Sequence, residues 1–125
     1  MNFLAHLHIA QHTNTSFVGN FLGDFVKGDP QGKFNRDIVK GIRLHRFVDS
    51  YIDQHHLVTS TKPLFEPELR RYSPIALDMF WDHCLAKHWL EFDPLPLADF
   101  CEKAQLQIEV ESALEKNSLP ERFNI

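Results

Sequence analysis

Polar residues interrupt the apolar stripes of three predicted helices, and this pattern most restricts how the chain can fold. An α-helix turns about 100° per residue, so residues three, four and seven positions apart share a face. Across residues 35–56 that face carries Ile38, Ile42, His45, Asp49 and Ile52. The corresponding faces elsewhere carry Ile75, Asp78, Asp82, Leu85 and Trp89 in residues 73–91, and Phe17, Phe21 and Asp24 in residues 16–26. A lone buried carboxylate is costly, so these acids require pairing, protonation or a metal ion.

Helix start and stop signals in the sequence predict an all-α domain of about five helices. Gly28 is a suitable stop signal, Asn35 a suitable N-cap, and Ser73 followed by Pro74 a suitable helix start. No segment shows sustained strand-like alternation, so we expect a single helical bundle over residues 1–125. The predicted helices cover residues 2–11, 16–26, 35–56, 73–91 and 97–116, with residues 57–72 irregular or weakly helical.

Composition places the chain among globular proteins. Of its 125 residues, 43% are apolar and 24% are charged, which is unlike a disordered chain. The formal charge of −4 argues against nonspecific nucleic-acid binding. The start is a poor signal peptide, no apolar run is long enough for a membrane span, and the two cysteines form no C-x-x-C pair. We therefore expect a cytoplasmic protein.

The inward polar residues together indicate a metal site between the helices. The set Asp24, His45, Asp49, Asp78 and Asp82 holds four carboxylates, which need more positive charge than one imidazole provides. A divalent cation supplies that charge, and helical bundles build such sites from inward side chains. The alternative is a buried ion-pair network with arginines such as Arg43, Arg46 or Arg71.

Oxygen and imidazole ligands favour manganese, magnesium or ferrous iron over a structural zinc. The natural chemistry of such a site is metal-assisted hydrolysis of a phosphate ester. His6 is placed to reach the site from the first helix. His83 is offset by about 100° from Asp82, which suits a supporting position or a neighbouring helix.

Charge is unevenly distributed along the chain. Residues 27–46 hold six basic and two acidic residues, a net of +4, whereas residues 91–125 hold eight acidic and three basic residues, a net of −5. Arg36, Lys40 and Arg43 share a helix face turned away from His45 and Asp49. That face is either a docking surface for an acidic partner or simply solvated.

Four ordered motifs resemble the bacterial acyl carrier protein phosphodiesterases. They are MNFLAHLHIA, GNFLGDFVKG, GIRLHRFVD and RRYSPIALDMFWDHCLAKHW, and LPERF near the end is also similar to the family. The resemblance implies an all-helical, HD-domain-like enzyme that depends on manganese. Its substrate would be holo-acyl carrier protein, from which it would release 4′-phosphopantetheine.

Position by position, the resemblance implies roles for residues already singled out. The implied metal ligands are His6, Asp24, His45, Asp49, Asp78 and Asp82. Asp24, Asp78 and His83 would take part in catalysis, and the carrier-protein surface would include Arg36, Lys40, Arg43 and Arg46.

Two alternatives stay open at this stage. One is an HD-like phosphohydrolase acting on a nucleotide or small phosphoester, and the other is a non-catalytic module that binds carrier protein or metal. Family members continue beyond the R-F stretch with further helical sequence, whereas this sequence ends at Ile125. We therefore expect the fifth helix to pack against a second copy or to be poorly ordered, because it carries apolar residues on more than one side: Phe100, Leu106, Ile108, Val110 and Leu114.

Overall fold

The computed structural model describes residues 2–115, and helices dominate that range. Within the described range there is no β-strand, only an isolated bridge between Gln31 and Phe34. The prediction of an all-α fold is therefore confirmed. The α-helices are α1 (Phe3–Thr13), α2 (Phe17–Leu22), α3 (Arg36–Gln54), α4 (His56–Thr59), α5 (Ser73–Lys87) and α6 (Leu97–Leu114). The 3-10 helices are η1 (Lys62–Leu64), η2 (Pro67–Tyr72) and η3 (Trp89–Glu91).

Side-chain caps mark the starts of α1, α2, α3 and α4. The Asn35 side chain accepts a hydrogen bond from Ile38 N at 2.9 Å, so α3 begins where predicted. Helix α5 begins close to the predicted position, but Ser73 is its first helical residue rather than its N-cap, and no side chain caps this helix. By contrast, α2 ends at Leu22, four residues before the predicted end, because the backbone N–H groups of Phe25 and Val26 both donate to the Leu22 carbonyl in a turn. Short helical turns α4, η1 and η2 occupy the segment expected to be irregular or weakly helical.

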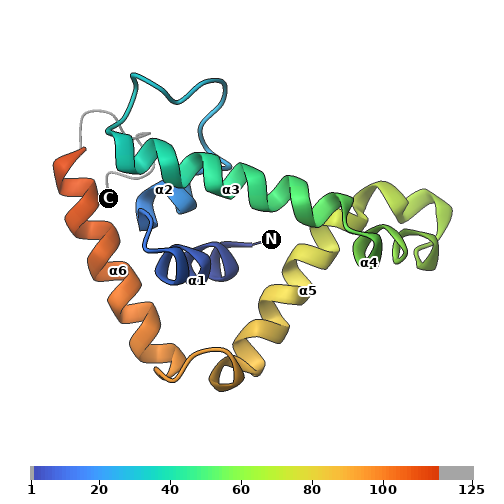
Figure 1. Cartoon of the computed structure of the whole chain (residues 1–125). Coiled ribbons are helices and arrows are strands. Elements are labelled where there is room, and N and C mark those ends of the chain that lie inside the picture. The colour runs from blue at the N-terminus through green and yellow to red at the C-terminus, as the bar shows by residue number, and fades with distance from the viewer. Residues whose placement is uncertain (1, 116–125) are drawn as a thin grey trace.

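Helices α1 and α2 lie inside a frame formed by α3, α5 and α6 (Figure 1). The closest backbone approach is between α2 and α3, where two glycines meet. A Cβ atom added to Gly19 would lie 2.4 Å from the Ile38 carbonyl oxygen and 2.9 Å from Gly41 Cα. This contact brings the end of α2 against the middle of α3, where His45 lies.

Two apolar clusters hold the frame together. One joins α1, α2, η3 and α6 through Ala10, Phe17, Trp89, Phe100 and Ala104. The other joins α2 to α3 through Val18, Leu22, Ile38 and Ile42. Ile108 of α6 packs against both clusters, so α6 is attached to the bundle along its inner side.

The outer side of α6 is exposed among the described residues. Leu106, Val110 and Leu114 are 55%, 60% and 79% exposed, whereas Phe100 and Ala104 on the inner side are buried. Residues 116–125, which include the LPERF stretch, lie outside the described range. No helix in that range is both long enough and apolar enough to cross a membrane.

Candidate metal centre

Two histidines and two aspartates meet where α1, α3 and the turn after α2 come together. His6 of α1 and His45 of α3 are each 1% exposed, and their rings stack with centroids 3.5 Å apart. Asp49 lies one turn after His45 and contacts both histidines, at 3.0 Å from His6 Nε2 and 3.3 Å from His45 Nε2. Asp24 is more exposed and places Oδ1 3.1 Å from His45 Nε2.

The hydrogen bond at Nδ1 fixes the orientation of the His45 ring. Nδ1 contacts the backbone carbonyl oxygen of Asn20, which only accepts, so the Nδ1 proton must point there. The lone pair of a neutral His45 therefore lies on Nε2, which faces the carboxylates of Asp24 and Asp49. A lone pair directed at two anions requires a proton or a metal cation between them. A carbonyl partner at one ring nitrogen is the usual arrangement of a metal-binding histidine.

Titration of the two central groups reflects this opposition of charges. Burial lowers the pKa of His45, but hydrogen bonds with Asp49 and Asn20 and the nearby Asp24 carboxylate raise it above its ordinary value overall. Burial raises the pKa of Asp49, and hydrogen bonds from His45 and His6 outweigh burial and hold that pKa well below the ordinary range. Asp49 is therefore a carboxylate across the physiological pH range.

The cluster fits a small divalent cation. One ligand atom each from His6, His45 and Asp49 lie within 4.8 Å of one another. Octahedral coordination at about 2.1 Å places adjacent ligands about 3.0 Å apart, which is close to both Asp49–histidine distances. In addition, His6 Nδ1 is buried without a hydrogen-bond partner, as expected if the cluster is organised for something other than hydrogen bonding alone. These residues could hold a metal ion.

The remaining predicted ligands, Asp78 and Asp82, lie on α5. Asp82 of α5 accepts hydrogen bonds from the backbone N–H groups of Leu4 at 3.0 Å and Ala5 at 3.1 Å. It thus fixes the first turn of α1, immediately before His6. Asp78 is half-buried on α5, and His83 is exposed.

Asp53 was missed in the sequence analysis. It follows Asp49 by one turn on α3, and its pKa is raised by burial and by the carboxylates of Asp78 and Asp49. Asp78 is therefore close enough to influence the acidic end of the cluster. The four-residue spacing of His45, Asp49 and Asp53 was the signal that could have identified Asp53.

The arginines proposed for an ion-pair network have other partners. Arg43 contacts Asp29 at 3.3 Å, and Arg71 contacts the Tyr72 hydroxyl at 2.5 Å. Arg46 donates to the backbone carbonyl oxygens of Val26 and Gly28, both at 2.7 Å. Arg46 therefore secures the loop between α2 and α3, with one partner in the turn that carries Asp24.

The basic face of α3 is exposed, and two aromatic residues extend it. Arg36, Lys40 and Arg43 are followed at helical spacing by Phe47 and Tyr51, which are 66% and 58% exposed. The two aromatic rings stack with centroids 6.3 Å apart. We call these five residues the α3 outer stripe, and it lies on the opposite side of α3 from His45 and Asp49.

Comparison with known proteins identifies close relatives. The sequence profile of the acyl carrier protein phosphodiesterase family matches residues 1–124. The acyl carrier protein phosphodiesterase of Pectobacterium atrosepticum is 51% identical over 124 residues, which are 98% of this chain and 62% of the relative. The proteins of the same name from Yersinia pestis and Klebsiella pneumoniae are 50% and 45% identical over 109 residues, which are 86% of this chain and 56% of each relative.

The chain therefore spans less than two thirds of the length of these relatives. No solved structure matches it.

Proposed function

The chain belongs to the acyl carrier protein phosphodiesterase family, and from that premise we propose that it takes part in the hydrolysis of holo-acyl carrier protein. The bond broken would join the phosphorus of 4′-phosphopantetheine to the serine oxygen of the carrier protein. Water would add to phosphorus, the serine oxygen would leave with a proton, and 4′-phosphopantetheine would be released. The observation that carries this proposal is the His6–His45–Asp49 cluster, whose ligand types and spacing suit a metal-dependent phosphohydrolase.

We assign the metal to His6, His45 and Asp49, with Asp24 as a further ligand at the exposed edge. The donor set of two imidazoles and carboxylates suits Mn²⁺, with Mg²⁺ or Fe²⁺ as alternatives. When bound, such an ion supplies Lewis-acid polarisation of a phosphoryl oxygen and acidifies a water molecule. We also propose that this metal site is an HD-like active site.

The chain's own residues would divide the other tasks. Asp24 is 56% exposed, so one of its oxygens can face solvent and orient or deprotonate the attacking water. Asp82 would act through α1, by holding the turn that positions His6. The roles of Asp78 as a ligand or catalytic group, and of His83 in catalysis, rest on the family resemblance alone.

The α3 outer stripe would attract the acidic carrier protein electrostatically, but it would not itself place the substrate at the metal site. The stripe and the cluster lie on opposite sides of a helix that is about 10–12 Å wide with its side chains. Long-range attraction by Arg36, Lys40 and Arg43 would raise the association rate without direct contact at the site. Arg46, proposed from the sequence as part of the same surface, would instead act through the loop that it secures.

The proposal is tested by incubating holo-acyl carrier protein with this chain and Mn²⁺ and measuring the carrier mass. We expect conversion to the apo mass with release of 4′-phosphopantetheine, and its loss on adding EDTA. Asp24→Ala should abolish conversion, whereas Asp29→Ala, which removes an exposed loop carboxylate outside the cluster, should retain it. Circular dichroism would establish that both variants keep their helical content.

Failure of the unaltered chain to convert the carrier protein, with Mn²⁺ bound and the helices intact, would refute the proposal for this chain. Metal-dependent cleavage of a small phosphodiester without cleavage of the carrier protein would instead support the alternative phosphohydrolase. The cytoplasmic location and the single-domain organisation of residues 1–125 stay predictions.

A further inference from the structure

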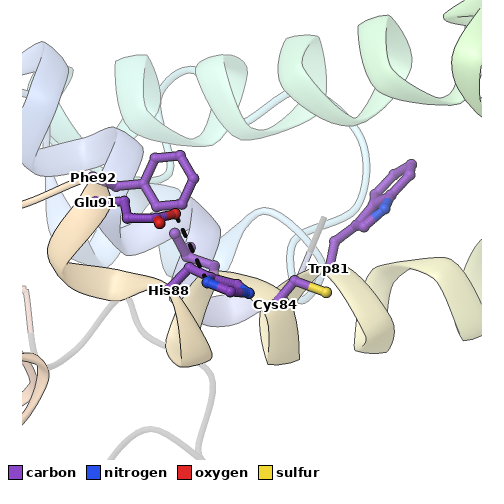
Figure 2. A pocket seen from close by; sticks show the side chains of 6 residues that line it. Trp81, Cys84, His88, Glu91 and Phe92 are labelled. Atoms are coloured by element: carbon purple, nitrogen blue, oxygen red, sulfur yellow. Dashed lines mark ion pairs between the residues drawn. The ribbon is translucent and has the colours of Figure 1, made fainter.

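A cavity of about 300 Å³ lies along α5 and η3, outside the histidine cluster. Figure 2 shows Trp81 and Phe92 at its two ends, with Cys84 and His88 between them. Leu85 completes an apolar wall, and Glu91 forms an ion pair with His88 at 3.8 Å. The cavity therefore combines aromatic and aliphatic walls with one polar side, and nothing in the metal-site chemistry described above uses it.

The cavity follows the helix axis away from the acidic end of the metal centre. Trp81 lies three residues after Asp78, whose carboxylate acts on Asp53 beside the cluster. Trp81 and Cys84 are about one turn apart on α5, and His88 follows directly after the end of that helix. Helix α5 carries the groove from Trp81 to the end of the helix at Lys87, about 9 Å along its axis, and η3 and Phe92 form the far end. The groove thus begins about one turn from Asp78 and leads away from it.

We propose that this groove holds the pantetheine arm of the substrate while its phosphate lies at the metal centre. This inference rests on the proposed function. The arm is comparable to four or five extended residues, or about 15 Å, so it can extend from Trp81 along the last turns of α5 and onto η3. The geminal methyl groups of its pantoyl unit would pack near Trp81, and its amides would face His88. Its thiol would lie toward Phe92.

The groove also makes chemical sense as a binding surface for this arm. The arm is uncharged between its phosphate and its thiol, with two amide groups and several apolar carbons. Aromatic walls bury the carbons, and a few polar side chains fix the orientation of the amides. Binding energy gained along the arm, away from the reacting phosphorus, would help to position the phosphodiester.

Two cysteines provide an internal test of this assignment. Cys84 lines the groove, whereas Cys101 is exposed on α6. The probe is S-methyl-4′-phosphopantetheine, whose capped sulfur cannot react with the labelling reagent. The chain would be treated with iodoacetamide with and without this probe, and alkylation of each cysteine would be followed by mass spectrometry.

We expect saturating probe to slow alkylation of Cys84 by at least tenfold and to change alkylation of Cys101 by less than twofold. Inorganic phosphate at the same concentration should protect neither cysteine, because it lacks the arm. Equal alkylation of Cys84 with and without the probe up to 10 mM would overturn the assignment, and so would equal protection by inorganic phosphate.

A pair of aromatic variants tests the wall of the groove. Trp81→Ala should raise the probe concentration for half-protection of Cys84 by about tenfold. Phe80→Ala removes a neighbouring aromatic residue that is 58% exposed and does not line the cavity, so it should leave that concentration within twofold. Equal effects of the two variants would contradict the inference.

This test separates the groove from the proposed activity. Protection of Cys84 without turnover of holo-carrier protein would retain the groove and refute the proposed function for this chain. Turnover without protection would retain the proposed function and place the arm elsewhere.

Discussion

Replacing Gly23 by alanine should dislodge His45 without altering any proposed ligand. Gly23 has φ −50° and ψ −36°, which an alanine adopts without strain. Its added Cβ would lie 2.1 Å from His45 Cγ and 2.2 Å from Cδ2. Carbon atoms normally stay about 3.5–4.0 Å apart, so the ring would have to withdraw by roughly 1.4 Å or more. The ring has little freedom to do so, because the His6 ring stacks at 3.5 Å and Asn20 holds Nδ1.

The expected consequences are a moderate loss of stability and a larger loss of function. Overpacking of this kind costs about 1–3 kcal/mol of unfolding free energy. Disturbing the support of a ligand typically lowers metal affinity by about 10–100-fold, and displacing a reacting group by about 1 Å can lower turnover by about 100-fold. Urea unfolding would measure the first quantity, calorimetric titration with Mn²⁺ the second, and the carrier-protein assay the third.

Gly28→Ala is the matched control for this prediction. Gly28 has φ +75°, so alanine is strained there by about 1–2 kcal/mol, yet nothing lies within 4 Å of the added Cβ. The control should therefore lose comparable stability and keep its Mn²⁺ affinity. If folded Gly23→Ala also bound Mn²⁺ within twofold of the unaltered chain, the placement of His45 as a ligand would be wrong.

Other residues of the structure lead to further predictions. Glu111→Gln should lower the unfolding free energy by about 1–3 kcal/mol, because the Glu111 carboxylate accepts hydrogen bonds from Ser16 and from the first turn of α2. Urea unfolding would measure this loss. An unchanged unfolding free energy would show that Glu111 does not stabilise the contact between α6 and α2. In the metal-free chain, protonated His45 should stabilise the fold below about pH 6.5, and this stabilisation should be lost as the pH rises through the raised pKa of His45 in the folded chain. Thermal unfolding at several pH values would detect the loss. Asp49 should give the opposite trend in acid, adding stability above about pH 3.9 that is lost as pH falls toward its lowered folded pKa. Reversing the charges of the α3 outer stripe with Arg36→Glu, Lys40→Glu and Arg43→Glu should lower kcat/KM for the carrier protein at low salt and reduce the salt dependence of kcat/KM. An unchanged kcat/KM at low salt would show that the stripe is only a solvated face. Val110→Glu places a charge on the exposed outer side of α6 and should reduce self-association measured by sedimentation. If the unaltered chain is already monomeric at micromolar concentration, the predicted contact between α6 and a second copy of the chain is wrong.

Sequence patterns predicted the helices because caps and apolar spacing act locally. The start of α3 depends on the Asn35 side chain, and α5 begins with Ser73 and Pro74 in its first turn; both signals are visible in the sequence. The early end of α2 was not predicted. It depends on a turn in which two N–H groups share the Leu22 carbonyl, and nearby apolar residues continued the helical spacing.

Helical spacing identified the acidic residues on buried helix faces, but it did not show which of them bind metal and which cap a helix. His45 and Asp49 were found by their spacing, and the structure brings them together with His6 and Asp24. Asp82 has the same inward spacing, but its carboxylate receives two backbone N–H groups of α1. A capping acid and a ligand acid leave the same mark on a helical stripe, because both replace an apolar residue on the buried face. Only the arrangement of α1 against α5 distinguishes them.

The hydrogen bonds from Leu4 and Ala5 to Asp82 also determine when the cluster can form during synthesis. These partners are 78 and 77 residues apart, whereas His45 and Asp49 are four residues apart. On the ribosome, α1 emerges early and must wait for α5 before its first turn is held. At about 5–20 residues per second, synthesis of the segment between His45 and Asp82 takes seconds, whereas a helix forms in about a microsecond or less. His45 and Asp49 would therefore be exposed to cellular metal ions before His6 is in place. For the metal site proposed above, an ion that meets the nascent chain would encounter an incomplete set of ligands, and selection among metals would be completed only when α5 folds back.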